Sequence, residues 1–270
     1  MKTLSFALNH MAAPSLPLGE FFALAKSLGT CAVEIRNDLA GNAIIDGTPA
    51  ATVRSEAEAQ GITIISINAL QRFNEWSDVR AAEALDLITY ARDCGAKALV
   101  LVPKNDGTGT EDGTRQANLR EALTALKPML TENGIIGLVE PLGFEMCSLR
   151  SKREAAEAIA AVGGEGTFKL VHDTFHHHLA GESDIFPALT GLVHISGVSD
   201  TDVSVSDMRD PHRVLVDDSD RLDNVGQIRA LLAAGFTGLF SFEPFSSAVH
   251  DLDDPETALA DSIAYIKKNV

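Results

Sequence analysis

Short apolar runs and longer amphipathic stretches alternate along this chain. Eight runs are dense enough in apolar or β-branched residues to predict buried strands: Thr3–Asn9, Ala32–Arg36, Ile62–Asn68, Ala98–Val102, Ile135–Val139, Phe168–Val171, Leu192–Ile195 and Leu239–Phe242. Between the runs, apolar residues recur at helical spacing, which predicts helices over Leu18–Leu28, Thr48–Gln60, Ser77–Cys94, Arg115–Asn133, Lys152–Val162, Ile185–Leu189, Val225–Ala234 and Pro255–Lys268.

Strands that alternate with helices, each strand a near-continuous apolar run, are typical of a parallel sheet covered on its outer face. We therefore predict an α/β protein with a (β/α)8 TIM barrel, formed as a single domain by residues 1–270. A doubly wound open sheet is the alternative, but no glycine-rich dinucleotide fingerprint follows the first strand. An irregular acidic insert runs from Gly197 to Asp223, and we expect it to cover the barrel mouth.

Charge and composition narrow the range of partners. The chain has 270 residues and a net charge of −16 without a Lys/Arg cluster, which argues against nucleic-acid binding. It has no apolar run of membrane-spanning length and no basic and apolar leader, so we expect neither a membrane anchor nor export. Three widely spaced cysteines fit buried thiols in a cytoplasmic protein. The expected partner is a small molecule, and the sequence leaves a homo-oligomer open.

Four of the predicted strands end in residues that can bind a metal. Glu140, Asp173, His194 and Glu243 follow the fifth to the eighth strands. The carboxyl ends of barrel strands face one mouth, so these side chains are expected to meet there. Each residue alone is better explained as a buried polar group with hydrogen bonds, because polar residues are common at strand ends. Their joint occurrence favours one divalent metal ion, of which Mn²⁺, Zn²⁺, Mg²⁺ and Co²⁺ suit three carboxylates and an imidazole.

A run of histidines follows Asp173. Three consecutive side chains cannot point at one place, so at most two of them face the mouth. His176 is the expected site residue, whereas His177 and His178 are expected to pack or to face solvent. His172 precedes Asp173 on the strand and should point the opposite way, toward the covering helices.

Five segments spread over most of the chain carry a resemblance to a known family: Asn68–Asn74, Val139–Gly143, His172–His176, Val193–Ile195 and Ser241–Phe245. In them the chain resembles the xylose-isomerase-like TIM barrels, a family of sugar isomerases and epimerases that also contains endonuclease IV. The pieces Asn-Ala-Leu from Asn68 and Asp-Thr-Phe-His from Asp173 are most similar to inosose isomerase-like members of this family.

The resemblance implies a metal site and substrate contacts at matching positions. It implies that the metal ligands are Glu140, Asp173, His194 and Glu243, and that substrate contacts come from His176, Arg213, Asn68 and Glu145. The chain departs from many relatives after Arg213, where Val214–Asp218 replaces a Pro-Gly-x-Gly turn. This departure affects the loop geometry and the identity of the substrate.

The activity implied is an isomerisation or epimerisation of an unphosphorylated polyol ketone through an enediolate, as in inositol catabolism. A metal that chelates both oxygens would polarise the carbonyl, with Glu140 and Glu243 as base and acid. The strand ends offer acidic residues at Ser199–Asp202 rather than a glycine-rich phosphate site, which favours a neutral substrate.

The sequence bears on four other activities. An inosose-type dehydratase and a ketose 3-epimerase would use the same metal site and stay open. A DNA-repair endonuclease would need a basic face, which a chain of net charge −16 does not offer. A non-catalytic sugar-binding barrel would be expected to lack one of the two glutamates.

Overall fold

The computed structural model describes residues 4–39, 44 and 46–270. Its eight strands form a closed parallel barrel in which each strand pairs with its neighbours in sequence and β1 pairs with β8. The strands are β1 Ser5–Asn9, β2 Ala32–Arg36, β3 Thr63–Gln71, β4 Ala98–Val102, β5 Ile136–Val139, β6 Phe168–Asp173, β7 Thr190–Ile195 and β8 Leu239–Phe242. The predicted (β/α)8 TIM barrel is confirmed. The predicted start of the first strand, Thr3, lies outside the described residues.

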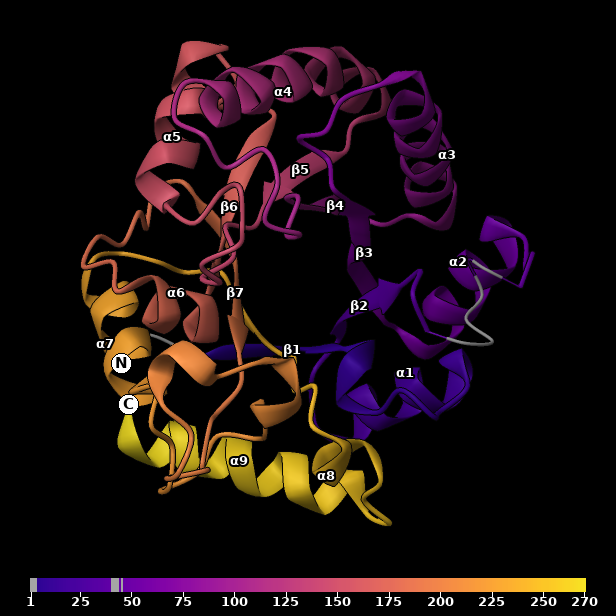
Figure 1. The fold of residues 1–270 in the computed structure, drawn as a ribbon. Coiled ribbons are helices and arrows are strands. Elements are labelled where there is room, and N and C mark those ends of the chain that lie inside the picture. The colour runs from indigo at the N-terminus through magenta and orange to yellow at the C-terminus, as the bar shows by residue number, and fades with distance from the viewer. Residues whose placement is uncertain (1–3, 40–43, 45) are drawn as a thin grey trace.

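Helices surround the ring of strands (Figure 1). They are α1 Leu18–Ser27, α2 Ala50–Gln60, α3 Asp78–Cys94, α4 Thr114–Asn133, α5 Lys152–Ala161, α6 Thr174–Ala180, α7 Asn224–Ala233, α8 Ser247–His250 and α9 Pro255–Asn269. Short 3₁₀ turns lie at His10–Ala12, Val205–Asp207 and Asp210–His212. Within the described part of the chain, none of these helices combines the length and the apolar character needed to cross a membrane.

The connection from β6 to β7 differs from the prediction. The expected helix over Ile185–Leu189 is wrong, because this segment forms only a turn in which Leu189 and Thr190 donate to the Phe186 carbonyl. The helix of this unit is instead α6, which begins directly after β6 and contains the three consecutive histidines. The carboxylate of Asp173 accepts hydrogen bonds from the backbone N–H groups of Phe175 and His176, and this N-cap starts the helix at once.

Residues along each strand alternate between two environments. Outward side chains such as Val33 and Ile35 of β2 pack against the helices in the main core. Inward apolar side chains form a smaller cluster, which comprises Ala69, Ala98, Val100, Leu138, Val171 and Leu192. Toward the carboxyl ends of the strands the inward positions become polar and stay buried: Asn9, Glu34, Asn68, Asp173, His194 and Ser241. The alternation therefore places a polar layer above the apolar floor of the barrel.

Glycine is required where β5 meets its neighbours. A Cβ atom at Gly137 would lie 2.7 Å from the Phe168 ring and 2.9 Å from the Leu130 side chain. Neither of these buried side chains can retreat without opening the packing of α4 on the sheet.

The acidic insert predicted between Gly197 and Asp223 folds back on its own start, next to the end of β7. Gly197 and Val214 form an antiparallel bridge, with N···O distances of 2.7 and 2.8 Å. Asp220 secures the base of the insert, because its carboxylate accepts from the backbone N–H groups of Leu222 at 3.1 Å and Asn224 at 2.8 Å. This arrangement brings Arg213, directly before the bridge, back over the carboxyl ends of the strands.

Candidate metal centre

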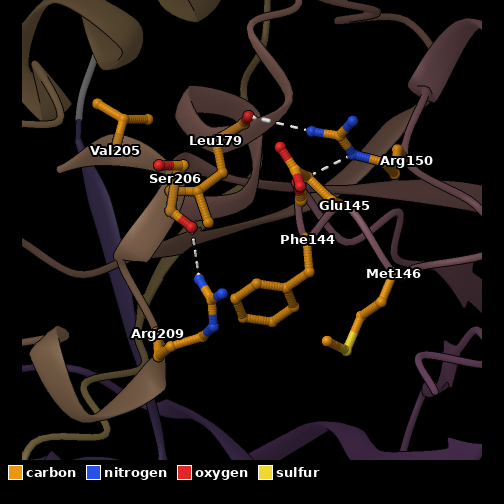
Figure 2. A pocket seen from close by; sticks show the side chains of 9 residues that line it. Phe144, Glu145, Met146, Arg150, Leu179, Val205, Ser206 and Arg209 are labelled. Carbon is orange, nitrogen blue, oxygen red and sulfur yellow. Dashed lines mark hydrogen bonds between the residues drawn. The ribbon is translucent and has the colours of Figure 1, made fainter. Parts of the chain in front are cut away.

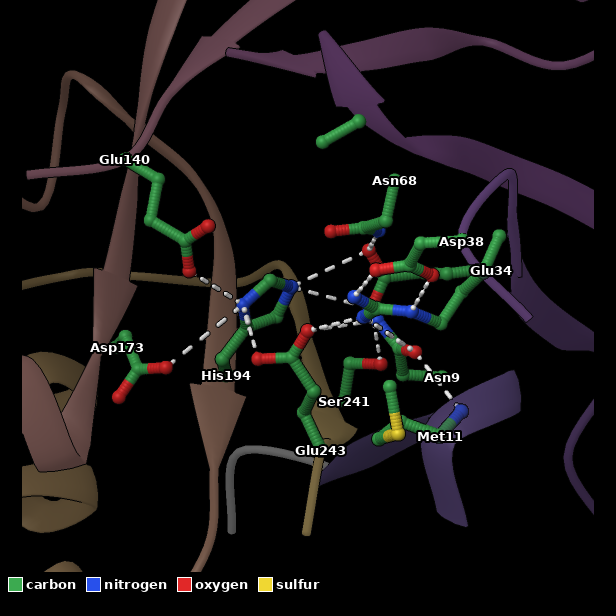
Figure 3. A network of polar contacts seen from close by, with 12 residues as sticks. Asn9, Met11, Glu34, Asp38, Asn68, Glu140, Asp173, His194, Ser241 and Glu243 are labelled. Atoms are coloured by element: carbon green, nitrogen blue, oxygen red, sulfur yellow. Dashed lines mark hydrogen bonds and ion pairs between the residues drawn. The ribbon is translucent and has the colours of Figure 1, made fainter. Parts of the chain in front are cut away.

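The four predicted ligands lie together at the carboxyl ends of their strands. One ligand atom from each of Glu140, Asp173, His194 and Glu243 lies within 4.8 Å of the others, and all four side chains are buried. Nδ1 of His194 is at the middle of the group, 2.8 Å from Glu140 Oε1, 3.2 Å from Glu243 Oε2 and 3.9 Å from Asp173 Oδ2 (Figure 3). The folded chain therefore aims three carboxylates at one imidazole nitrogen.

The other ring nitrogen of His194 faces a fourth carboxylate. Nε2 lies 3.2 Å from both carboxylate oxygens of Glu34, which comes from β2 and is completely buried. Both ring nitrogens therefore face carboxylates, which accept hydrogen bonds. A metal ion bound at Nδ1 would use the lone pair on that side, so Nε2 would keep the ring proton and donate it to Glu34.

Two buried arginines hold the carboxylates in place. Arg213 donates from one guanidinium nitrogen to Asp173 at 2.7 Å and to Glu243 at 3.1 Å. Arg36 donates to the other oxygen of Glu243 at 2.7 Å. Both guanidinium groups lie over the ring of Phe245, at 4.6 Å for Arg213 and 5.3 Å for Arg36. Glu243 is thus bound on both of its oxygens.

Burial and close charges shift the acid–base equilibria of the group. Burial raises the pKa of Glu140, and His194 offsets this rise only in part. Burial alone would also raise the pKa of Glu243, but His194, Arg213 and Arg36 hold it well below its usual value. For His194, burial lowers the pKa, yet Glu243, Glu34 and Glu140 together raise it well above the usual value. The raised pKa values of Glu140 and His194 express the preference of this site for added positive charge, whereas Glu243 stays ionised beside its cationic neighbours.

The fixed charges fit a divalent cation. Beside His194, the buried charged groups here are four carboxylates and two guanidinium groups: Glu34, Glu140, Asp173, Glu243, Arg36 and Arg213. Asp38 and Asp210 also contact these arginines, but their side chains are 39% and 43% exposed, so water screens them. The buried set carries two more negative than positive charges, which a divalent ion would balance. Carboxylate oxygens and an imidazole nitrogen are also the donors that Mn²⁺ and Zn²⁺ accept.

A cavity of about 360 Å³ opens above this group. Its lining includes Glu140, Glu243, Arg213, Asn68 and His176, the predicted site residues from five different segments. His176 is buried and its Nδ1 has no hydrogen-bond partner among the described residues, so this atom is available to a ligand.

Asn68 contacts the residues beneath the metal-ligand group as well as the cavity. Its side-chain nitrogen donates to Glu34 at 2.8 Å, below the metal-ligand group. The remaining surface of Asn68 lines the cavity. This residue therefore connects the base of the site to its mouth.

The structure does not bring Glu145 to the same place. Its side chain is exposed and lines a neighbouring cavity with Arg150 and Arg209 (Figure 2). Phe144 lies between the two cavities, because it contributes to the lining of both. The β5 strand ends at Val139, so five residues of loop carry Glu145 away from the strand end.

The other histidines near Asp173 lie behind the barrel wall, as predicted for His172. Its Nδ1 is 3.0 Å from Nζ of the buried Lys152, and its Nε2 is 2.9 Å from the side-chain oxygen of Gln227. His177 Nδ1 also contacts Lys152 Nζ, at 2.6 Å. These contacts join α5, β6, α6 and α7 on the outer side of the sheet.

Sequence reasoning missed Glu34, Arg36 and Asn9. Asn9 donates to Glu243 at 3.1 Å and accepts from Arg36 at 3.2 Å. The signal that could have found the first two is the alternation Val33-Glu34-Ile35-Arg36, in which charged residues occupy the inward positions of a buried strand.

Comparison with known proteins supports the same fold. The family model described as xylose isomerase-like TIM barrel matches residues 22–269. None of the curated proteins compared with the chain matches it. Among solved structures, a xylose isomerase domain containing protein from Salmonella typhimurium LT2 is 35% identical with a TM-score of 0.89, over 97% of this chain and 96% of that one.

Two further structures are similar at lower identity. The IolI protein, solved with a zinc atom bound, is 19% identical with a TM-score of 0.88 over 99% of both chains. An L-ribulose 3-epimerase is 19% identical with a TM-score of 0.72, over 99% of this chain and 94% of that one. At this identity they indicate the shared fold. From the family match over most of its length, the chain belongs to the xylose isomerase-like TIM barrel family.

Proposed function

We propose that this protein is a divalent-metal-dependent isomerase or epimerase of an unphosphorylated polyol ketone, such as an inosose or a related ketose. The observation that carries the proposal is the Nδ1 atom of His194 facing three buried carboxylates at the base of a cavity. The zinc atom of the similar IolI structure and the L-ribulose 3-epimerase among the similar folds agree with it.

The proposed ligands are Glu140, Asp173, His194 and Glu243. When bound there, a divalent ion supplies a Lewis acid that polarises the carbonyl of the substrate. Moving the carbonyl, or inverting the carbon next to it, requires that a proton leave one carbon and return to the same or the neighbouring carbon.

The two glutamates are suited to unequal parts in this proton transfer. Among the described residues, the side chain of Glu140 accepts a hydrogen bond only from His194, and burial raises its pKa. Glu243 is instead held ionised by Arg36 and Arg213. We assign the uptake of the substrate proton to Glu140, with Glu243 as the second carboxylate at the reacting carbons.

The cavity lining favours a neutral polyhydroxylated substrate. Five carboxylates and three guanidinium groups line it, and both buried arginines already contact carboxylates: Asp38, Asp106, Glu140, Asp210, Glu243, Arg36, Arg72 and Arg213. This surface offers many hydrogen-bond partners for hydroxyl groups and a net charge that disfavours a phosphate dianion. Phe144 and Phe245 provide flat apolar walls, whereas Phe73 and Trp76 belong to the core outside the cavity.

The decisive experiment uses metal-loaded protein in deuterated water with a panel of inososes and ketoses. An enediolate route requires that deuterium from the solvent appear at the carbons next to the carbonyl, which nuclear magnetic resonance detects. Mass spectrometry separates an isomer or epimer from a product that has lost water, the mark of a dehydratase. Absence of exchange with every neutral ketone, together with rapid turnover of a phosphorylated ketose, would overturn the proposal.

A further inference from the structure

Glu34 lies next to the candidate metal centre without belonging to the group of four ligands. It comes from β2, is completely buried, and faces the ring nitrogen of His194 that points away from the other carboxylates. We propose that Glu34 is a positioning residue: it fixes His194 in the tautomer that presents Nδ1 to the metal, and it supplies a buried negative charge that balances the metal. This inference rests on the metal-dependent function proposed above.

The carboxylate of Glu34 is the acceptor in each of its hydrogen bonds. Its oxygens accept from Ser241 Oγ at 2.5 Å, Ser66 Oγ at 2.6 Å and Asn68 Nδ2 at 2.8 Å. An ionised carboxylate has no proton to give, so Nε2 of His194 must be the donor at 3.2 Å. With a metal ion at Nδ1, the ring would carry its one proton on Nε2, and the hydrogen bond to Glu34 would hold the ring in that tautomer.

The residues that contact Glu34 lie on strands of the closed barrel. Ser66 and Asn68 belong to β3, Ser241 to β8 and His194 to β7, while Glu34 itself is on β2. Figure 3 shows Glu34, Asn68 and Ser241 on the side of His194 opposite Glu140 and Asp173. A ligand held in this way cannot rotate without breaking hydrogen bonds to several strands, and partners of this kind are known to tune metal affinity.

The charge of Glu34 is part of the balance of the buried set. Without it, three carboxylates would face two guanidinium groups, and a divalent ion would leave one positive charge in excess in a buried place. Loss of Glu34 is therefore expected to weaken metal binding in two ways, through the orientation of His194 and through charge.

The test is the metal affinity of Glu34→Gln, measured by competition with a chelating dye for Mn²⁺ and Zn²⁺. We expect affinity to fall by roughly ten- to a hundredfold, the usual effect of removing a partner of a metal-binding histidine. Side-chain ¹⁵N resonances of His194 should show a single tautomer, protonated at Nε2, in the metal-loaded wild type and mixed ring states in the variant. The matched control is Glu182→Gln, which removes a carboxylate that accepts from Ser151 and the Lys152 backbone at the start of α5, and its metal affinity should equal the wild type.

The outcomes distinguish failure of the proposed metal-dependent function from failure of the positioning role of Glu34. If the wild type binds no divalent metal, the proposed function fails. If the wild type binds metal and Glu34→Gln binds it equally well, only the positioning role fails, even where the chelated variant melts at a lower temperature. If Glu34→Gln does not fold, Ser241→Ala decides, because it keeps the carboxylate and removes its shortest donor. An affinity about threefold weaker supports the role, and an unchanged affinity overturns it.

Discussion

At the scale of single residues, Asp173 has two roles, one with each of its carboxylate oxygens. Its Oδ1 caps α6 through the N–H groups of Phe175 and His176, while its Oδ2 faces Arg213 and the ligand group. Asparagine caps a helix as well as aspartate does but lacks the charge, so substitution can separate the two tasks.

We expect Asp173→Asn and Asp173→Ala both to lose most of their metal affinity and the ion pair with Arg213. Of the two chelated variants, Asp173→Asn should be more stable by about 1 kcal/mol, because only asparagine keeps the helix cap. Dye competition and urea unfolding of the chelated proteins provide the two measurements. Equal stability of both variants would contradict the capping role, and full metal occupancy in either would contradict the ligand role.

Glu243 provides a second prediction at this scale. Glu243→Gln keeps the size of the side chain and one ligand oxygen, so some metal should remain bound. Turnover should fall by roughly a hundredfold or more, the scale expected when a proton-transferring carboxylate is lost. The control is Glu145→Gln in the neighbouring cavity, which should behave as the wild type. Near-normal turnover of Glu243→Gln in steady-state assays at saturating metal would remove this residue from the reaction.

Arg213 makes contacts that lysine cannot reproduce. Its planar guanidinium donates to Asp173, Glu243 and Ser196, whereas an ammonium group is a single point of charge. We expect Arg213→Lys to raise KM by about tenfold, since the wall of the cavity loses its shape. Arg209→Lys, at an exposed arginine of the neighbouring cavity, should leave KM unchanged. The same KM in both variants would mean that Arg213 does not act on the substrate.

At the scale of elements, the order of strands and helices follows from hydrophobic periodicity, and so do the strand ends that carry Glu140, Asp173, His194 and Glu243. Periodicity failed at α6, because the helix is fixed by a side-chain cap at Asp173 and not by an apolar stripe. The alternation in β2 marks Glu34 and Arg36 as inward-facing charged residues, but it does not reveal which residues they contact. Their positions matter only because the closed barrel brings β2 opposite β7 and β8, a juxtaposition that no local pattern contains.

A buried lysine joins several elements behind the sheet and predicts a pH effect. Burial lowers the pKa of Lys152 from 10.5 to about 8, although Glu182, Asp173 and Asp184 oppose this shift. Between these two values the unfolded chain holds a proton that the folded chain has lost, so the free energy of unfolding rises with pH across this window. The free energy of unfolding should rise by about 1.4 kcal/mol for each pH unit, and by about 3 kcal/mol over the whole window.

Comparison with Lys152→Met isolates this contribution, because other groups also titrate above pH 8. Urea unfolding at several pH values should give a wild-type stability that rises relative to the variant as pH increases from 8 to 10.5. Two parallel curves would show that the proton of Lys152 is not linked to folding.

At the scale of the whole molecule, the candidate metal centre lies at the carboxyl ends of the strands, while the main core lies between the sheet and the helices. Chelation should therefore abolish turnover and leave the far-ultraviolet circular dichroism spectrum unchanged. The melting temperature should fall toward a constant value as chelator is added, because bound metal stabilises only the folded state. Restored turnover after dialysis into Mn²⁺ or Zn²⁺ is the control, and turnover that survives complete metal removal would contradict the site.

The single bridge between Gly197 and Val214 has a consequence for how such a barrel can diversify. The segment between these two residues starts and ends at one pair of backbone groups, so a change in its length places little strain on β7 or β8. Among the described residues of this segment, Asp210 and Arg213 line the cavity, so substitutions near Asp210 change what meets the substrate without altering the pairing of the barrel strands. A lineage can thus explore new sugars through a short stretch of chain, and exchange of residues 209–212 between relatives would be the laboratory equivalent of that history.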